Sequence, residues 1–326
     1  MFLDAAITVL VPVHDAALHL AETLASLRAQ TFTDWSCICV DDGSTDASAA
    51  ILAETAAADP RFRVLSRPHG GVSAARNALL DAAGGEWIFF LDADDVLAHD
   101  CLGTLMECVR AHDVELGWAQ YDRFSDSPPV PSPQGESRLM EGSGWRKLLA
   151  RSFSLSRPAA ASGVFGNVPC QPWNKLIRRR LLDGLRFDES LSRGEDLVFF
   201  AEVFRRVDRV AVSSRTTYLY RDSPGTLFRT AGGYAGFHAY VDAVCRFAES
   251  DRPPYMGGYL ARRWVLSWLK GVWRWAGLKE NSAARRQFTD DCRRLRAAFA
   301  DRMPPVSRMV LAMAPRLVRI KHGGAK

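Results

Sequence analysis

Carboxylates gather directly after an unbroken apolar run in the first third of the chain. The run Trp87–Leu91 leads into Asp92-Ala93-Asp94-Asp95. An Asp-x-Asp pair offers hard oxygen ligands, which suit Mg²⁺ or Mn²⁺ bridging a phosphate. An isolated pair of this kind is more often a solvated loop or a helix cap, because Asp is common at strand ends and N-caps. The rest of the chain must decide between these two interpretations.

A second pair of carboxylates, Glu195-Asp196, precedes the apolar run Leu197–Phe200 and is predicted to open a helix. One of these carboxylates could accept a proton as a general base. The helix dipole also favours acidic residues at a helix N-terminus without any catalytic role. On these residues alone both interpretations stay open.

The elements that must position these residues are predicted from hydrophobic periodicity. The predicted strands are 7–13, 35–40, 62–65 and 87–91, and the predicted helices are 18–29, 47–58, 73–83 and 100–112. This alternation indicates an α/β fold with a doubly wound, mostly parallel sheet flanked by helices. Right-handed crossovers place three polar strand ends, 12–15, 41–46 and 92–95, at one edge of that sheet, where such sheets bind ligands.

The middle of the chain is predicted in less detail. Residues 114–124 hold enough alternating residues for a pair of strands, and 125–137 are rich in Pro and Ser and predict a loop. A short helix is expected at 144–153. Residues 210–212 and 217–221 are typical of two edge strands.

Composition excludes several classes of protein. The chain has 326 residues, of which 48% are apolar and 24% charged, so it is neither disordered nor fibrous. Its seven cysteines lack the spacing of a metal site, and we expect reduced structural thiols. No signal peptide and no uncharged apolar run of membrane-spanning length is found, so we expect a cytoplasmic protein, which could also work at the inner face of the cell membrane.

Nucleotide-binding signatures of other enzymes are missing from the sequence. No Gly-x-x-x-x-Gly-Lys-Ser/Thr loop occurs, which disfavours a P-loop ATPase. No Gly-x-Gly-x-x-Gly follows the first predicted strand, which counts against a dehydrogenase.

Four segments together resemble the signature set of family 2 glycosyltransferases with the GT-A fold. They are Val11-Pro12-Val13-His14-Asp15, Val40-Asp41-Asp42-Gly43-Ser44-Thr45-Asp46, Gly71-Val72-Ser73-Ala74-Ala75-Arg76-Asn77 and Phe90-Leu91-Asp92-Ala93-Asp94-Asp95. They stand in the family's order, each at the end of a predicted element, over roughly the first 110 residues. Four ordered motifs are far more specific than one, so the metal interpretation of the Asp-x-Asp pair is now preferred.

The resemblance implies a nucleotide-sugar site. The residues it assigns to the donor are Pro12, Val13, Asp15, Asp41, Asp42, Arg76, Asp92, Ala93 and Asp94. Asp41 or Asp42 would face an N–H group of uracil or another base, and Arg76 would point to the nucleotide unless it is a surface helix arginine. Asp94 matches the metal-binding position, and Asp92 matches its partner on ribose or metal. A divalent cation, Mn²⁺ or Mg²⁺, would bridge the phosphates and neutralise the leaving diphosphate.

The later motifs resemble the family's acceptor half. Glu195-Asp196 matches the segment that carries the catalytic base, and the resemblance assigns that role to Asp196 with Glu195 beside it. Trp173, Lys175 and Arg221 would contact the acceptor or the diphosphate. Two alternatives stay open, because Lys175 could be a surface charge and Arg221 could pair with the adjacent Asp222.

Two domains are expected: residues 1–230 as the GT-A domain and 231–326 as a basic helical extension. The GT-A domain divides into a nucleotide-sugar-binding half at 1–112 and an acceptor half at 113–230. From Gly257 to the end there are 16 Lys and Arg against 4 Asp and Glu. The segments 262–277 and 306–320 combine Lys and Arg with an apolar face, and the first is rich in Trp. This pattern is typical of a membrane-surface helix, although a packed helical cap explains it equally well. Nucleic acid is not an expected partner, since no binding motif appears.

These features predict a metal-dependent inverting glycosyltransferase, a hexosyl- or N-acetylhexosaminyl-transferase. The donor would be a nucleotide-sugar, most simply a UDP-sugar. The acceptor would be a hydroxyl of a glycan or lipid-linked glycan, as in bacterial cell-surface polysaccharide synthesis. The alternatives are a sugar nucleotidyltransferase, which should carry a Gly-rich basic signature near the first strand, and a non-catalytic nucleotide-sugar-binding module. The intact acidic pairs count against the second alternative.

Overall fold

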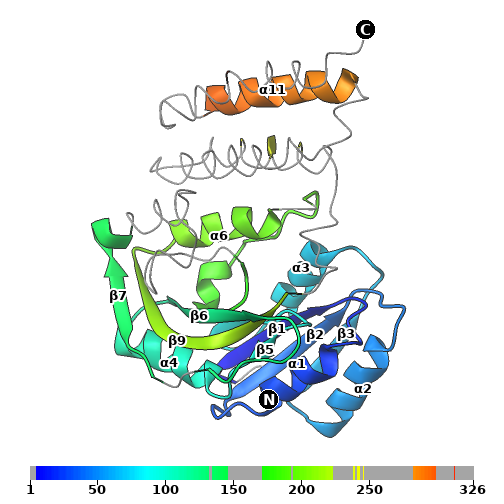
Figure 1. The fold of residues 1–326 in the computed structure, drawn as a ribbon, viewed down its shortest axis with the longest axis vertical. Helices are drawn as coiled ribbons and strands as arrows, with labels where there is room; N and C mark the ends of the chain where they lie inside the picture. The colour runs from blue at the N-terminus through cyan, green and yellow to red at the C-terminus, as the bar shows by residue number, and fades with distance from the viewer. Residues whose placement is uncertain are drawn as a thin grey trace. The chain divides into compact units, whose positions relative to one another are not determined.

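The structure is a computed structural model, which describes residues 5–131, 134–145, 171–191, 194–222 and 282–298, with single positions at 238, 241, 242, 245 and 312 (Figure 1). The chain divides into two compact units. The first comprises Met1–Trp145, Cys170–Glu189 and Glu202–Thr226, and the second comprises Arg146–Pro169, Ser190–Ala201 and Leu227–Lys326. Each unit is described by itself.

The first unit begins with the predicted alternation of strands and helices. The elements are β1 (Ile7–Val13), α1 (Leu20–Arg28), β2 (Trp35–Asp41), α2 (Ser48–Ala58), β3 (Phe62–Ser66), α3 (Val72–Ala82), β4 (Trp87–Phe90) and α4 (Cys101–Ala111). Every residue of β2 and β4 is buried. Continuous apolar runs therefore became interior strands, as their lack of alternation predicted.

The strands form one mixed sheet in the order β3-β2-β1-β4-β8-β6-β9-β5, with β7 on β9. The later strands are β5 (Val96–Leu97), β6 (Leu116–Phe124), β7 (Ser137–Glu141), β8 (Lys175–Arg178) and β9 (Arg209–Arg221). β1 pairs in parallel with both β2 and β4, whereas β8 is antiparallel to β4 and β6. The parallel part brings the ends of β1, β2 and β4 to one edge.

Two predictions for the second half of the sheet were wrong. Residues 114–124 hold one strand, β6, whose pairing with β9 shifts register near Trp118 and Gln120. The two edge strands are one continuous strand, β9, which has partners on both sides. Its half-exposed centre, Ser214–Thr216, looked like a break because polar residues interrupt the apolar pattern there. Most of the helix predicted at 144–153 lies outside the described residues.

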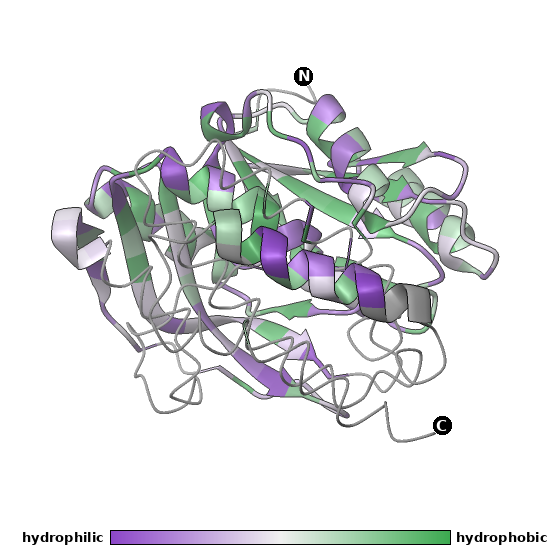
Figure 2. Ribbon diagram, turned by 90° about the horizontal axis from the view of Figure 1, so that it is seen from above, coloured by the Kyte–Doolittle hydropathy of each residue, from purple (hydrophilic) through white to green (hydrophobic). Residues whose placement is uncertain are grey.

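The main core is built from the apolar faces of the sheet and of the helices against it. Figure 2 shows hydrophobic colour on the strands in the middle of the sheet and mixed colour on the helices and on other strands. Leu20, Leu24 and Leu27 of α1 are buried with β1 and β2, as their spacing predicted. Cys37 and Cys39 of β2 are buried free thiols within this core.

The second unit includes the start of α6 (Glu195–Arg205) and the helix α11 (Ser282–Ala298). Phe288, Cys292 and Leu295 form a buried stripe on α11, while Arg286 and Arg293 are exposed. This amphipathic helix lies between the two basic segments predicted at 262–277 and 306–320, which fall outside the described residues apart from position 312. Within the part of the chain described, no helix combines the length and the apolar character needed to cross a bilayer.

Candidate active site

The loop that follows β4 carries the predicted metal pair. Asp92 forms an ion pair with Arg76 of α3, with Nη2 lying 3.3 Å from Oδ1. The side chain of Arg76 is only 7% exposed and its guanidinium lies over the ring of Phe187. The surface interpretation of Arg76 is therefore wrong, because α3 turns this residue inward against the acidic loop.

Three carboxylates crowd this loop, and the pKa values of Asp94 and Asp95 are raised. Burial, followed by the negative charge of Asp92, raises the pKa of Asp94 to about 6. Burial and both neighbouring carboxylates raise the pKa of Asp95 well above its usual range. Because the ionised carboxylates are destabilised here, a bound cation would stabilise them strongly. Asp92 and Asp94 are both partly exposed, so their oxygen ligands fit a divalent cation.

Asp95 points the other way, into the protein. It is fully buried, with Oδ2 accepting the Tyr218 hydroxyl at 2.6 Å and Oδ1 accepting the backbone N–H of Arg221 at 2.8 Å. The Arg221 side chain is 5% exposed, donates from Nε to the Asp94 carbonyl at 2.8 Å and bonds to Glu22. Sequence reasoning missed the roles of Asp95, Tyr218 and Glu22, because nothing in their spacing links them.

The loops after β1 and β2 are tied together through their polar side chains. Asp15 accepts the backbone N–H of Thr45 at 2.7 Å, and this hydrogen bond lowers the pKa of Asp15. In return, the N–H of Asp15 donates to Ser44 Oγ at 3.1 Å. Asp41 accepts the N–H of Ser44 at 3.1 Å. The structure thus brings Asp15 and Asp41 together, as the shared sheet edge predicted.

Asp42 organises the turn before α3. Its buried carboxylate accepts the N–H groups of Gly70 at 3.1 Å and Gly71 at 2.8 Å, and Arg67 lies 3.0 Å away. Gly71 has φ of 88°, a conformation that glycine tolerates far better than other residues. Asp42 therefore couples the end of β2 to the start of the helix that carries Arg76.

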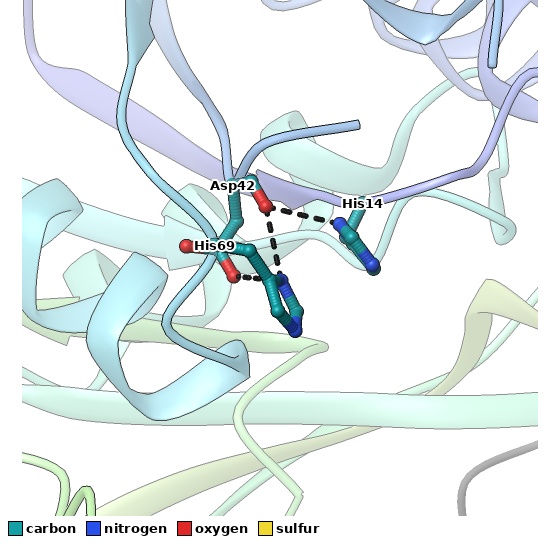
Figure 3. A group of neighbouring side chains, drawn as sticks. All are labelled: His14, Asp42 and His69. Atoms are coloured by element: carbon teal, nitrogen blue, oxygen red, sulfur yellow. Dashed lines mark hydrogen bonds and ion pairs between the residues drawn. The ribbon is translucent and has the colours of Figure 1, made fainter. Parts of the chain in front are cut away.

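His14 and His69 stack beside Asp42, with ring centroids 4.1 Å apart (Figure 3). Their Nδ1 atoms lie 3.0 and 3.1 Å from the Asp42 carbonyl oxygen. The three residues have the ligand types of a metal site. However, the Asp42 carboxylate already accepts the N–H groups of Gly70 and Gly71. Both Nδ1 atoms must carry a hydrogen to donate to the Asp42 carbonyl oxygen, so neither Nδ1 atom can bind a metal in this arrangement. Hydrogen bonding accounts for this cluster without a cation. Sequence reasoning missed it, although His14 lies within one quoted motif and His69 stands two residues before another.

The Trp173-Asn174-Lys175 motif is interior. Trp173 stacks on Tyr218 with centroids 4.6 Å apart, and Asn174 donates to the Ala119 carbonyl at 2.8 Å. Lys175 is fully buried, and its Nζ donates to the carbonyls of Gln171 and Trp173. The surface-charge alternative for Lys175 is therefore wrong, because β8 inserts in the middle of the sheet. Its contact with an acceptor or diphosphate stays a prediction.

The remaining predicted residues have simple surroundings. Pro12 and Val13 end β1, where they pair with Val40 and Asp41. Glu195 and Asp196 form the first turn of α6 and belong to the second unit. Both are partly exposed, and Asp196 Oδ1 accepts the N–H of Leu197 at 2.6 Å. Their catalytic role stays a prediction.

Two sequence relatives of this chain are named as a glycosyltransferase and as a succinoglycan biosynthesis protein. The chain is 29% identical over 244 residues to the glycosyltransferase GlyA of Streptococcus pneumoniae, covering 75% of this chain and 34% of GlyA. It is 31% identical over 229 residues to the succinoglycan biosynthesis protein ExoO of Rhizobium meliloti, covering 68% of this chain and 62% of ExoO. The chain thus spans about a third of one relative and less than two thirds of the other.

Two solved structures share the fold. S. aureus TarS 1–349 in complex with UDP-GlcNAc superimposes with a TM-score of 0.74 at 20% identity, over 97% of this chain and 88% of that one. A mannosyltransferase from Pyrobaculum calidifontis in complex with GDP-Man and Mn²⁺ gives 0.55 at 16% identity, over 98% and 84%. The sequence model described as glycosyl transferase family 2 matches residues 8–184, more than half of the chain. With the acidic loop, the Asp42 turn and the GT-A sheet in place, this chain belongs to glycosyl transferase family 2.

Proposed function

We propose that this chain is a metal-dependent inverting glycosyltransferase that uses a UDP-sugar. The acceptor is a hydroxyl of a glycan or lipid-linked glycan in cell-surface polysaccharide synthesis. The observation that carries the proposal is the Asp92–Asp94 loop at the carboxyl edge of a parallel sheet, with Arg76 buried against it. A relative named as a glycosyltransferase, a relative named for succinoglycan biosynthesis and a solved structure in complex with UDP-GlcNAc support the same chemistry.

The donor half of the site divides into three tasks. Asp94 and Asp92 hold a divalent cation, which neutralises the diphosphate when it is bound. Arg76 keeps Asp92 in place and adds positive charge near the nucleotide. Asp41 reads the base, since the carboxylate of Asp42 already binds Gly70 and Gly71. The TarS complex supports uracil as that base, and the mannosyltransferase complex supports a metal such as Mn²⁺.

The transfer itself needs one base. The acceptor oxygen attacks the anomeric carbon, the bond from that carbon to the diphosphate oxygen breaks, and the acceptor proton passes to Asp196. The negative charge that develops on the diphosphate is stabilised by the positive groups of the donor half, which are the divalent cation and Arg76. Glu195 lies beside the base in the first turn of α6.

A thermal-shift panel tests the donor assignment. UDP-, GDP- and dTDP-sugars are compared with and without Mn²⁺, and a UDP-sugar with Mn²⁺ should raise the melting temperature most, because ligands that bind only the folded state stabilise it. Asp94→Ala should abolish the gain from Mn²⁺. Glu54→Ala removes an exposed carboxylate on α2 and serves as the matched control. Equal gains in Asp94→Ala and the control would contradict the metal assignment.

Product analysis separates the alternative functions. A glycosyltransferase releases UDP from its donor, and slow hydrolysis reveals this even without the correct acceptor. A nucleotidyltransferase would instead release pyrophosphate from UTP and a sugar phosphate. A binding module would shift the melting temperature without releasing UDP.

We extend the proposal to a peripheral membrane contact through the basic C-terminal extension. Sixteen Lys and Arg against four Asp and Glu from Gly257 onward support attraction to anionic lipid. The full chain should cosediment with anionic vesicles at low salt and lose this binding at high salt. Equal binding to neutral vesicles would contradict this contact.

A further inference from the structure

One hydroxyl joins the two ends of the acidic loop. The backbone N–H of Asp92 donates to the Tyr218 oxygen at 3.2 Å, and the Tyr218 hydroxyl donates to Asp95 Oδ2 at 2.6 Å. Tyr218 is 123 residues further along the chain than Asp95. The loop that presents Asp92 and Asp94 is therefore closed from behind by a side chain of β9.

The Tyr218 ring has little freedom to move. It is fully buried, and Trp173 stacks on it at 4.6 Å with an interplanar angle of 10°. The backbone of Tyr218 pairs with Leu97 in β5, the strand directly after the loop. A rigid ring thus holds its hydroxyl at a defined place beneath the loop.

Further hydrogen bonds that involve backbone groups fix the loop at both ends. The N–H of Leu91 donates to the Leu10 carbonyl at 3.0 Å at the end of β4. The N–H of Arg221 donates to Asp95 Oδ1 at 2.8 Å, and Arg221 Nε donates to the Asp94 carbonyl at 2.8 Å. The three residues between Leu91 and Asp95 include both predicted metal ligands, so their conformation depends on the Tyr218–Asp95 link.

We propose that Tyr218, acting through Asp95, is a positioning residue for the metal-binding carboxylates. The hydroxyl holds the Asp92 amide and the Asp95 carboxylate together, which sets the separation of the Asp92 and Asp94 side chains. Groups behind metal ligands commonly change metal affinity about 10–100-fold when they are removed. This inference rests on the proposed use of a divalent cation by Asp92 and Asp94.

Tyr218→Phe is the direct test, because it removes the hydroxyl and keeps the ring on Trp173. The apparent Mn²⁺ dissociation constant is measured on the full chain by electron paramagnetic resonance of free Mn²⁺, in the presence of saturating UDP. The variant should bind Mn²⁺ about tenfold more weakly. UDP release from a UDP-sugar should recover at saturating Mn²⁺, which a general structural defect would not allow.

Tyr121→Phe is the matched control. Tyr121 is the register partner of Tyr218 in β6, and its ring contacts the same Trp173 at 4.8 Å. Its hydroxyl has no part in the loop contacts described above, so Mn²⁺ affinity should stay at the wild-type value. A second variant, Asp95→Asn, probes the link from the other side. The amide of Asn has the same shape as the carboxylate of Asp. If its Oδ1 still accepts the Arg221 N–H, its Nδ2 faces Tyr218 and cannot accept the hydroxyl hydrogen.

The outcomes separate this inference from the proposed function. Weaker Mn²⁺ binding in Tyr218→Phe and Asp95→Asn, with Tyr121→Phe unchanged, supports it. If Tyr218→Phe does not fold, Asp95→Asn alone decides by the same comparison. Wild-type Mn²⁺ affinity in the variant that folds overturns the positioning role and leaves the proposed function intact. Absence of Mn²⁺ binding by the wild-type protein overturns both.

Discussion

Asn77 and Phe187 bond to each other in both directions across the first unit. Asn77 Nδ2 donates to the Phe187 carbonyl at 3.0 Å, and the Phe187 N–H donates to Asn77 Oδ1 at 2.8 Å. The same Nδ2 donates to Glu189 at 2.9 Å. The helix of Arg76 is thereby joined to a segment 110 residues away, and Phe187 is held beneath the Arg76 guanidinium.

Asn77→Ala should therefore destabilise the protein. The change leaves a buried N–H and a buried carbonyl of Phe187 without their partner, which costs about 2–3 kcal/mol. Urea unfolding followed by circular dichroism measures the loss. Asp81→Ala is the control, because Asp81 pairs with Arg186 between the same segments at the surface, where such pairs contribute less than about 1 kcal/mol. Equal losses of unfolding free energy in the two variants would show that the paired Asn77–Phe187 hydrogen bonds stabilise the protein no more than the surface ion pair does.

The raised pKa of Asp94 predicts a pH-dependent stability of the metal-free protein. A carboxyl whose pKa is about 6 when folded, above its unfolded value of 3.8, binds its proton more tightly in the folded state. The associated stability is full below the unfolded pKa and is lost as pH rises through about 6. At pH 7.5 in EDTA, Asp94→Asn should raise the melting temperature by a few degrees, corresponding to roughly 1 kcal/mol.

The difference between Asp94→Asn and wild type should shrink at pH 4.5, where wild-type Asp94 is mostly protonated. Scanning calorimetry at both pH values provides the comparison. With added Mn²⁺ at pH 7.5, the wild-type protein should have the higher melting temperature, because only its Asp94 carboxylate binds the cation well. An Asn variant that is less stable than wild type in EDTA at pH 7.5 would contradict the electrostatic cost of Asp94.

Asp196→Asn tests the catalytic base. The amide cannot accept the acceptor proton, so transfer should fall by about 10²–10⁴-fold while donor binding stays unchanged. Glu202→Gln, later in α6 and paired with Arg205, is the control and should keep most activity. Radiolabelled sugar transfer and calorimetric UDP binding measure the two effects. Near wild-type transfer by Asp196→Asn would exclude it as the base.

Arg76→Lys tests the buried ion pair with Asp92. Lysine keeps the charge but lacks the planar fork, so the contact to Asp92 loosens. UDP affinity in the presence of Mn²⁺ should fall about tenfold by calorimetry, in line with losing one charged hydrogen bond. Arg63→Lys, on an exposed position of β3, should leave the affinity unchanged. Equal affinities of both variants would remove Arg76 from the donor half.

The sequence by itself determined the first half of the sheet and the acidic loops. β1 to β4 lie within two residues of their predicted bounds. β1, β2 and β4 are almost wholly buried, and strands buried on both faces are recognised by their continuous apolar runs. The polar residues after β1, β2 and β4 then had to share one edge, since parallel strands with right-handed crossovers allow no other arrangement. This argument places Asp92 and Asp94 at the ligand-binding edge, whereas their role as metal ligands rests on the resemblance to the family and stays a prediction.

Only the tertiary structure decided which polar groups face inward. Lys175 and Arg221 have side chains that usually lie at the surface, yet both are buried because β8 and β9 are inner strands of the sheet. The four residues of β8 are too few to show a period, and their partners come from β4 and β6. The Tyr218–Asp95 bond likewise depends on a strand pairing between distant segments. Local sequence carries no record of such a pairing, because the free energy that holds it comes from contacts made only after the chain has folded.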